Sequence, residues 1–193
     1  MKKVISTQLT QYLENNDLLD ECQYAYRSNS STEQALRNVT EQIYKSIDKG
    51  KISFLVLLDL YKAFGGVNHD LLLNKLVQLN IDSTWFASYL HDRTHSVKID
   101  KIISEAKSNL CRVQQGSILG PILFNIYLSM TFLKLIDYQK LPYSTIIYAD
   151  NVQLLISRTP YNFEQLKIHA ETSLKTMKEC YNENGLKMNS NKT

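Results

Sequence analysis

Two aspartates far apart in the chain are the side chains best suited to hold a metal ion. Asp59 directly follows the apolar run 52–58, and Asp150 lies between two strand-like runs, 145–148 and 152–156. If these runs are neighbouring strands of one sheet, the two carboxylates can meet at one end of it. Facing carboxylates repel each other unless a cation lies between them, and Mg²⁺ suits such oxygen ligands. A pair of these ions about 3.5–4 Å apart is the usual device for phosphoryl or nucleotidyl transfer.

The segment around Asp150 has the pattern of a β-hairpin. Ala149, Asp150 and Asn151 are all that separates the two strand-like runs, which places the acid at the tip of a tight turn. A carboxylate there is held rigidly and stays open to solvent, which suits a metal ligand. Two plainer interpretations stay open, because Asp and Asn are ordinary turn-forming residues and Asp59 could simply cap its strand.

The hydrophobic pattern predicts the elements that position these acids. The nearly continuous apolar run 52–58 predicts a strand covered on both faces, and so a central strand of a layered sheet. Segments 17–29 and 60–67 are irregular, and alternation predicts a strand or a ribbon at 97–103. Helices are predicted over 5–16, from Ser30 or Ser31 to Gly50, after an Asn68 cap, around Trp85, from Ser117 through Leu128 and over about 163–181. This interleaving indicates an α+β domain.

Composition sets broad limits on the class of protein. The chain has 193 residues, of which 44% are hydrophobic and 21% charged, so it is long enough for one domain with a core, or one and a fragment of another. A net charge of +3 permits nucleic-acid binding without arguing for it. The three isolated cysteines speak against a disulfide framework and a zinc site and favour a reducing compartment. Without a signal peptide or an apolar run near the ~20 residues of a membrane span, we expect a soluble intracellular protein with no membrane partner. Nucleus and cytoplasm both stay open.

Six short blocks in this order carry a resemblance to a known family. The block 114–121, Gln-Gln-Gly-Ser-Ile-Leu-Gly-Pro, is the most specific of them. The set resembles the reverse transcriptase of non-LTR retrotransposons, the LINE and jockey-like kind, over essentially the whole chain. The other blocks are Gln23–Arg27 with Ser31-Thr32, Leu57–Phe64, Val67–His69, Tyr148–Asn151 and Gly185–Asn189 with Lys192-Thr193.

The resemblance implies a fold and an activity. The fold is a polymerase palm, an antiparallel sheet packed on helices, with part of the fingers and no thumb. Residues 1–50 are then partial fingers and 51–193 a palm truncated at its C-terminal end, together one continuous domain 1–193. The implied activity is RNA-directed DNA polymerisation with Mg²⁺ or Mn²⁺. The implied partners are an RNA template, a DNA primer and deoxynucleoside triphosphates, and the abrupt end suggests a piece of a larger retrotransposon polyprotein.

The family's catalytic roles carry over to matching positions. The resemblance implies that Asp59 and Asp150 ligate the metal ions. Asn151 occupies the position of a second acid beside Asp150 in the catalytic set. Lys192 resembles the lysine that the family places near the leaving pyrophosphate.

The substrate-binding roles carry over in the same way. Arg27 would neutralise phosphate charge, since a planar guanidinium can bind it bidentately. Phe64 would lie under the sugar of the incoming nucleotide, where its bulk excludes a 2′-hydroxyl. Gln115 and Gly116 would line the pocket for the incoming base and template. Backbone groups would approach the triphosphate at Leu60, Tyr61, Lys62 and Ala63.

Several positions depart from the family pattern. Asn151 replaces an acid, Gly65 and Asn68 stand where the family usually has aspartates, and Gln114 replaces a proline. These changes favour an alternative, a catalytically decayed palm that retains at most weak nucleic-acid or protein binding. A further alternative is an RNA-templated RNA polymerase or another palm-bearing nucleotidyltransferase, against which the bulk of Phe64 argues.

Overall fold

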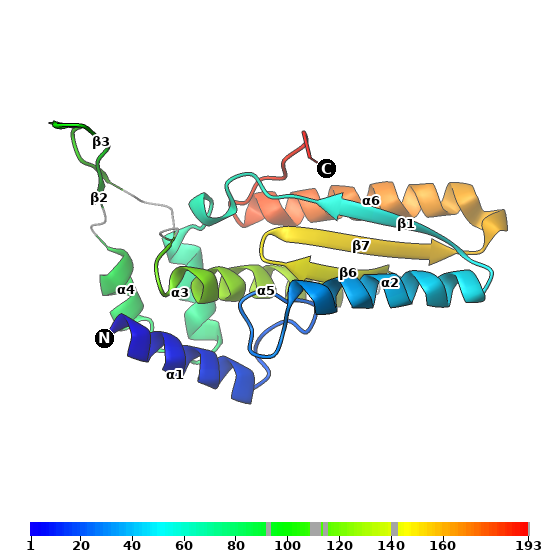
Figure 1. Ribbon diagram of the computed structural model, residues 1–193, viewed down its shortest axis with the longest axis horizontal. Helices are drawn as coiled ribbons and strands as arrows, with labels where there is room; N and C mark the ends of the chain where they lie inside the picture. Colours follow the sequence, from blue (N-terminus) through cyan, green and yellow to red (C-terminus); the bar gives the residue numbers. More distant parts are fainter. Residues whose placement is uncertain (92–93, 109–112, 114–115, 140–142, 193) are drawn as a thin grey trace.

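The computed structural model describes residues 1–91, 94–108, 113, 116–139 and 143–192. A three-stranded sheet lies between helices, with further helices beyond one end of the sheet (Figure 1). This arrangement confirms the α+β class. The helices are α1 (Lys2–Asn15), α2 (Thr32–Asp48), α3 (His69–Gln78), α4 (Thr84–Leu90), α5 (Gly120–Gln139) and α6 (Phe163–Glu183), with short 3-10 helices η1 (Ala63–Gly65) and η2 (Pro160–Asn162).

The sheet is antiparallel throughout, with the strand order β1-β7-β6. Its strands are β1 (Ile52–Leu58), β6 (Tyr143–Tyr148) and β7 (Asn151–Arg158). Leu58 lies opposite Val152, and Tyr148 lies opposite Asn151. A two-residue turn, Ala149-Asp150, therefore joins β6 to β7, which confirms the predicted hairpin.

Each face of the sheet receives a different helix. Phe54 and Val56 of β1 pack with Ile156 of β7 against Leu166 and Ala170 of α6. On the opposite face, Ala35 and Val39 of α2 pack against Ile146 of β6. The sheet is thus the middle layer of three, as the ribbon shows (Figure 1).

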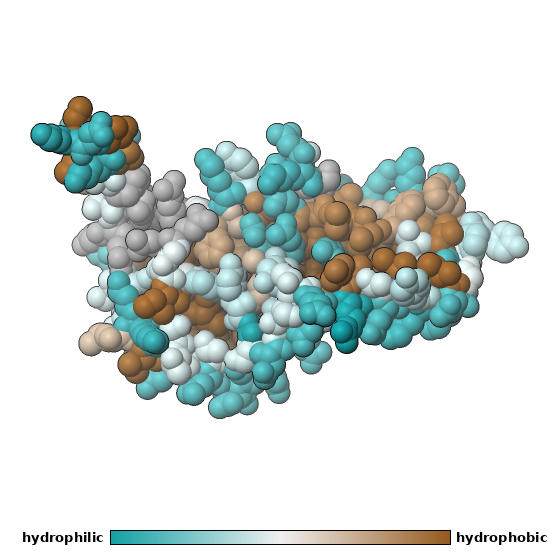
Figure 2. Space-filling view, in the orientation of Figure 1, coloured by the Kyte–Doolittle hydropathy of each residue, from teal (hydrophilic) through white to brown (hydrophobic). Residues whose placement is uncertain are grey.

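Strand β1 is not the doubly covered central strand that its sequence predicts. It pairs with β7 alone among the described strands, and Leu55 and Leu57 on the α2 face are 41% and 53% exposed. The reason is that α2 packs on this face against Ile146 of β6 and does not cover Leu55 and Leu57. Apolar side chains accordingly gather between α6 and α2 in the space-filling view (Figure 2).

The largest core cluster lies where α3 and α5 meet the hairpin, on the face of the sheet that α6 also covers. Residues 122–129 of α5 are buried at every position, and Leu72 and Leu76 of α3 pack with them. The helix predicted through Leu128 extends further, to Gln139. The predicted caps are confirmed: Ser31 Oγ accepts a hydrogen bond from the Gln34 amide (3.2 Å), and Asn68 Oδ1 from the Leu71 amide (3.0 Å).

A slender arm projects from the body of the molecule between α4 and α5 (Figure 1). Its strands pair in twos, β2 (Thr94–His95) with β5 (Lys107–Ser108) and β3 (Lys98–Ile99) with β4 (Ile102–Ile103). This pairing confirms the predicted ribbon. Across the described residues, no helix combines the length and the apolar character needed to cross a lipid bilayer.

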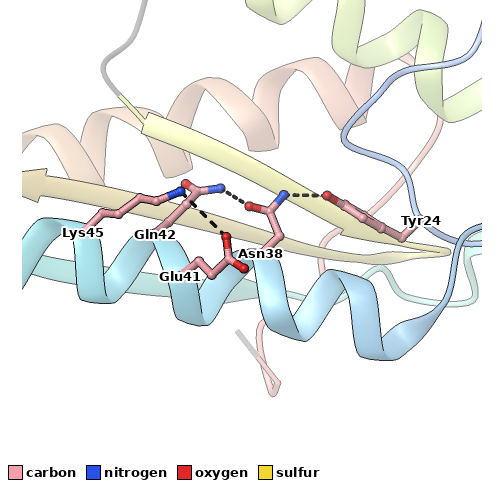
Figure 3. A network of polar contacts seen from close by, with 5 residues as sticks. All are labelled: Tyr24, Asn38, Glu41, Gln42 and Lys45. Carbon is pink, nitrogen blue, oxygen red and sulfur yellow. Dashed lines mark hydrogen bonds and ion pairs between the residues drawn. The ribbon is translucent and has the colours of Figure 1, made fainter.

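The segment 17–29, irregular by sequence, is firmly attached to the hairpin. The Ile147 amide donates to the Cys22 carbonyl (2.7 Å), and the Tyr24 amide donates to the Ile147 carbonyl (2.8 Å), so residues 22–24 run parallel to β6. Helix α2 braces Tyr24 from the side through a row of amides (Figure 3): Asn38 Nδ2 donates to the Tyr24 hydroxyl, and Gln42 Nε2 donates to Asn38 Oδ1.

Candidate active site

The two predicted metal ligands lie at the same end of the sheet. Leu58, the last residue of β1, is paired with Val152. Asp59 follows this pair on one chain segment and Asn151 precedes it on the other, so continuing the register by one residue brings Asp59 level with Asn151. Asp150 follows at the hairpin tip. The end of β1, the hairpin turn and the C-terminal tail are seen together at this end (Figure 1).

The C-terminal tail pairs with the segment that carries Asp59. The Asn189 amide donates to the Asp59 carbonyl (2.8 Å), and the Tyr61 amide donates to the Lys187 carbonyl (2.8 Å). The side chains meet as well, because Asn189 Nδ2 donates to Asp59 Oδ2 (2.8 Å) and Lys192 Nζ lies 3.7 Å from the same oxygen. The structure thus brings two predicted site residues together, Asp59 and Lys192.

Gln23 fixes the hairpin tip that carries Asp150. Its Oε1 accepts hydrogen bonds from the amides of Ala149 (3.0 Å) and Ala25 (2.9 Å), and its Nε2 donates to the Ala149 carbonyl (3.2 Å). Gln23 is 2% exposed. Ala149 has a φ of 57°, in the left-handed region that a non-glycine residue enters at a cost of about 1–2 kcal/mol. The three hydrogen bonds of Gln23 offset this cost and hold the turn in one conformation.

We expect Gln23→Leu to destabilise the fold by about 2 kcal/mol. The substitution keeps the side chain's bulk but leaves two amides and one carbonyl without this partner, and an unsatisfied buried group costs roughly 1–3 kcal/mol. Urea unfolding measures the change. Gln11→Leu, at an exposed position of α1, is the matched control, and equal losses in the two variants would contradict the clamp.

Residues 60–64 form a compact turn after the end of β1 and Asp59. The side chains of Leu60 and Ala63 are buried in the core, whereas Tyr61 is exposed and Lys62 Nζ lies 5.2 Å from its ring centroid. Lys62 has a φ of 47°, and its carbonyl accepts from the Gly65 amide (2.7 Å). The side chains of Leu60 and Ala63 thus serve packing, and any contact they make with a triphosphate would come from their backbone.

Phe64 belongs to an aromatic group beside the hairpin tip. It stacks on Phe124 of α5 at a centroid distance of 4.6 Å, and the edge of Tyr26 approaches it at 6.5 Å. Burial raises the pKa of the Tyr26 hydroxyl above its ordinary value, and the nearby Asp150 carboxylate raises it further. Tyr26 therefore links the predicted sugar-binding ring to the predicted metal ligand.

Of the remaining predicted substrate-binding residues, Arg27 is bound to its own loop. Arg27 Nη1 donates to the Asp20 carbonyl (2.7 Å), which ties one nitrogen of the guanidinium into its own loop. Of the contacts between described residues, none joins Arg27 to Asp59 or Asp150. Gly116 is exposed with a φ of 82°, and Gln115 lies outside the described residues.

A buried lysine anchors the turn from which the tail departs. Lys75 Nζ, from α3, donates to the Tyr127 carbonyl (2.8 Å), Thr131 Oγ1 (2.7 Å) and Asn184 Oδ1 (2.8 Å), and it lies 4.1 Å from the Tyr127 ring centroid. The Tyr127 hydroxyl in turn donates to the Asn184 carbonyl. This network joins α3, α5 and the end of α6, so the position of the tail depends on the core.

A close glycine contact completes the anchor of the tail. A Cβ at Gly66 would come 3.0 Å from the Gly185 carbonyl oxygen and 3.2 Å from Leu186, and Gly185 has a φ of 69°. Gly65, by contrast, has ordinary space for a Cβ. Packing therefore explains the second glycine of the Gly65-Gly66 pair and not the first.

The oxygen donors at this end of the sheet fit a hard divalent cation. Both contacts of the Asp59 carboxylate fall on Oδ2, and Asp150 accepts no hydrogen bond from any residue the structure describes. Free carboxylate oxygens of this kind are the ligands that Mg²⁺ and Mn²⁺ prefer. Across the described ranges no group of three or more His, Cys, Asp or Glu side chains is placed so that it could hold a metal ion. The neutral Asn151 beside Asp150 therefore matters for the charge of the site. Burial, followed by Asp20, raises the pKa of the Cys22 thiol to about 12, which rules it out as a nucleophile at neutral pH.

Two residues of this site have no role in the sequence-based prediction. Gln23 and Asn189 both lie inside blocks that carry the family resemblance, so their blocks point to the region. Nothing in the residue types identifies their partners, because Gln23 contacts Ala149 across 126 positions and Asn189 contacts Asp59 across 130.

A helix-backed antiparallel sheet with two acids at one end defines a partial polymerase palm. The chain belongs to the reverse transcriptase (RNA-dependent DNA polymerase) family, whose model matches residues 1–193. It is 27% identical over 163 residues to a probable RNA-directed DNA polymerase from transposon BS of Drosophila melanogaster, covering 81% of this chain and 18% of that protein. It is 30% identical over 129 residues to the probable RNA-directed DNA polymerase from transposon X-element of the same organism, covering 65% and 14%. The resemblance to reverse transcriptases of non-LTR retrotransposons is confirmed, and the chain spans less than a fifth of these relatives.

Solved structures agree on the fold. Telomerase from Candida albicans, in complex with a fragment of telomeric RNA, matches with a TM-score of 0.64 over 97% of this chain and 33% of that one. Apo telomerase from Candida tropicalis matches with a TM-score of 0.65 over 98% of this chain and 35% of that one. At 14% identity in both cases, the match speaks for the fold alone.

Proposed function

We propose that this chain is the palm and part of the fingers of an RNA-directed DNA polymerase of a mobile element. Asp59 and Asp150 at one end of the sheet, with carboxylate oxygens free for a cation, carry the proposal. Residues 51–193 would form the palm and residues 1–50 the part of the fingers. The substrates would be a DNA primer on an RNA template and deoxynucleoside triphosphates, and the longer relatives suggest that the domain works within a larger protein.

The primer 3′-hydroxyl gives up its proton to solvent, its oxygen forms a bond to the α-phosphorus of the nucleotide, and the bond from the α-phosphorus to pyrophosphate breaks. Divalent ions held at this site would supply Lewis acidity to the phosphoryl transfer. Asp59 and Asp150 would hold these ions, and Lys192, whose side chain is 70% exposed, is free to reach the departing pyrophosphate. Phe64 is fixed by its stack on Phe124, so it can serve as a rigid floor under the sugar that excludes a 2′-hydroxyl.

Primer extension on an RNA template tests this function. The full chain, at high concentration with Mg²⁺ or Mn²⁺, is expected to extend a DNA primer with deoxynucleotides in preference to ribonucleotides. Asp59→Asn is expected to lower the rate at least a hundredfold, whereas Asp48→Asn, an exposed acid at the end of α2, should leave it unchanged. Absence of any extension by the full chain at high concentration would end the claim of activity.

A second candidate is a decayed palm that folds without catalysing. The observations that favour it are Asn151, an exposed amide level with Asp59, and Gly65, which has room for a side chain that it lacks. Restoring the acid at position 151 separates the two candidates. If Asn151→Asp gives an inactive chain activity, the site was disabled at position 151. If it does not, more of the site has been lost.

A further inference from the structure

We propose that Asn189 is a positioning residue that holds the Asp59 carboxylate ready for ion binding. The inference rests on the function proposed above. It goes beyond that function because it assigns a role to a neutral side chain that touches neither substrate nor ion. The role is to fix one oxygen of the carboxylate so that the other faces the cation.

Asn189 is attached to Asp59 twice. Its backbone amide donates to the Asp59 carbonyl at 2.8 Å, and its side-chain Nδ2 donates to Asp59 Oδ2 at 2.8 Å. The backbone hydrogen bond fixes the position of the tail along the segment that carries Asp59. The second hydrogen bond restricts rotation of the carboxylate and leaves Oδ1 without a partner among the described residues.

The other half of the Asn189 amide organises the approach of Lys192. Asn189 Oδ1 accepts from the Asn191 amide (3.3 Å), and the Asn189 carbonyl accepts from the Lys192 amide (3.0 Å). These bonds fold the tail back so that Lys192 Nζ comes 3.7 Å from Asp59 Oδ2. One asparagine therefore sets the positions of both the predicted metal ligand and the predicted pyrophosphate-binding lysine.

The neutrality of the amide suits this task. A cation beside Asp59 would repel an incoming divalent ion, whereas an amide donor stabilises the ionised carboxylate without adding a positive charge. Without divalent ions, Lys192 is the cation beside Asp59. Because the lysine side chain is exposed, its ion pair with Asp59 is weak and easy to displace. The amide thus remains on Oδ2 when an ion arrives, and the lysine becomes free to move to a phosphate.

Binding of Mn²⁺ alone, followed by the paramagnetic resonance of the free ion, tests the inference without any turnover. Asn189→Leu is expected to weaken Mn²⁺ binding by the full chain about tenfold, the size of effect that partners of metal ligands usually have. Asn191→Leu is the matched control, since Asn191 is exposed on the same tail two positions away, and its Mn²⁺ affinity should stay within twofold. Circular dichroism confirms that each variant is folded at the temperature used, and Asn189→Ala replaces Asn189→Leu if the larger side chain prevents folding.

A double-mutant cycle with Asp59→Asn shows whether Asn189 acts through Asp59. In the Asp59→Asn background, Asn189→Leu is expected to have no further effect on Mn²⁺ affinity. The inference is overturned if Asn189→Leu and Asn191→Leu bind Mn²⁺ alike while Asp59→Asn binds it weakly, and in that case the proposed function stands. The inference is also overturned if Asn189→Leu still lowers the Mn²⁺ affinity in the Asp59→Asn background. If Asp59→Asn binds Mn²⁺ as well as the unaltered chain does, the proposed metal site falls together with the inference.

Discussion

Asn151→Asp is expected to raise the rate of primer extension about a thousandfold. The register places residue 151 level with Asp59, next to Asp150, so the substitution adds a third carboxylate to the site. One unit charge at about 4 Å from another, at an effective dielectric near 20, is worth roughly 4 kcal/mol, and more against a divalent ion. If that energy is expressed in the barrier, a factor of ten for each 1.4 kcal/mol gives the thousandfold change.

The same substitution should have a signature that does not depend on turnover. Without divalent ions, the added carboxylate repels Asp59 and Asp150 and lowers the melting temperature, whereas millimolar Mn²⁺ should restore it. Asn182→Asp, at an exposed position of α6, adds the same charge away from the site and should show neither effect. An unchanged extension rate together with an Mn²⁺-independent melting temperature would mean that position 151 does not face the ions.

Lys75→Met is expected to cost about 3 kcal/mol of unfolding free energy. The lysine is buried and donates three hydrogen bonds, and bonds to a charged group contribute about 1.5–3 kcal/mol each. Methionine restores apolar packing but leaves Thr131 Oγ1 and Asn184 Oδ1 without this donor. For a chain of this length the loss corresponds to a fall in melting temperature of roughly 10 °C.

Urea unfolding with Lys178→Met as the control decides the importance of this network. Lys178 is an exposed lysine of α6, so its replacement should change stability by no more than about 0.5 kcal/mol. Because Asn184 begins the turn that leads to the tail, Lys75→Met should also increase hydrogen exchange at the Asn189 amide. A stable variant with unchanged exchange at Asn189 would show that the tail is held without the lysine.

Local signals were sufficient for most of the elements. The Ser31 and Asn68 caps and the turn at Ala149-Asp150 are determined by residues within a few positions of one another, and the structure confirms all three. The exposure of β1 could not be predicted in the same way. An apolar run indicates that a strand is stabilised by burial on both faces. How far α2 extends across the sheet, however, depends on its packing against Ile146, far along the chain.

The candidate site also contains residues that the sequence could identify and residues that it could not. Asp59 and Asp150 could be found because each ends or interrupts a strand-like run, and the resemblance gave Lys192 its role. The residues that hold them could not be found, because a glutamine and an asparagine are ordinary in loops and tails. Only the folded chain shows that Gln23 is buried against Ala149 and that Asn189 donates to Asp59.

The residues that form this site are far apart in the sequence, which has a consequence for biosynthesis. Asp59 leaves the ribosome 130 residues before Asn189, and at ordinary rates of translation that interval is on the order of ten seconds. Until β7 (Asn151–Arg158) has also left the ribosome, the uncharged strand β1 has no partner strand and is open to association with other nascent chains. Residues 52–58 are therefore exposed during translation until β7 has been made.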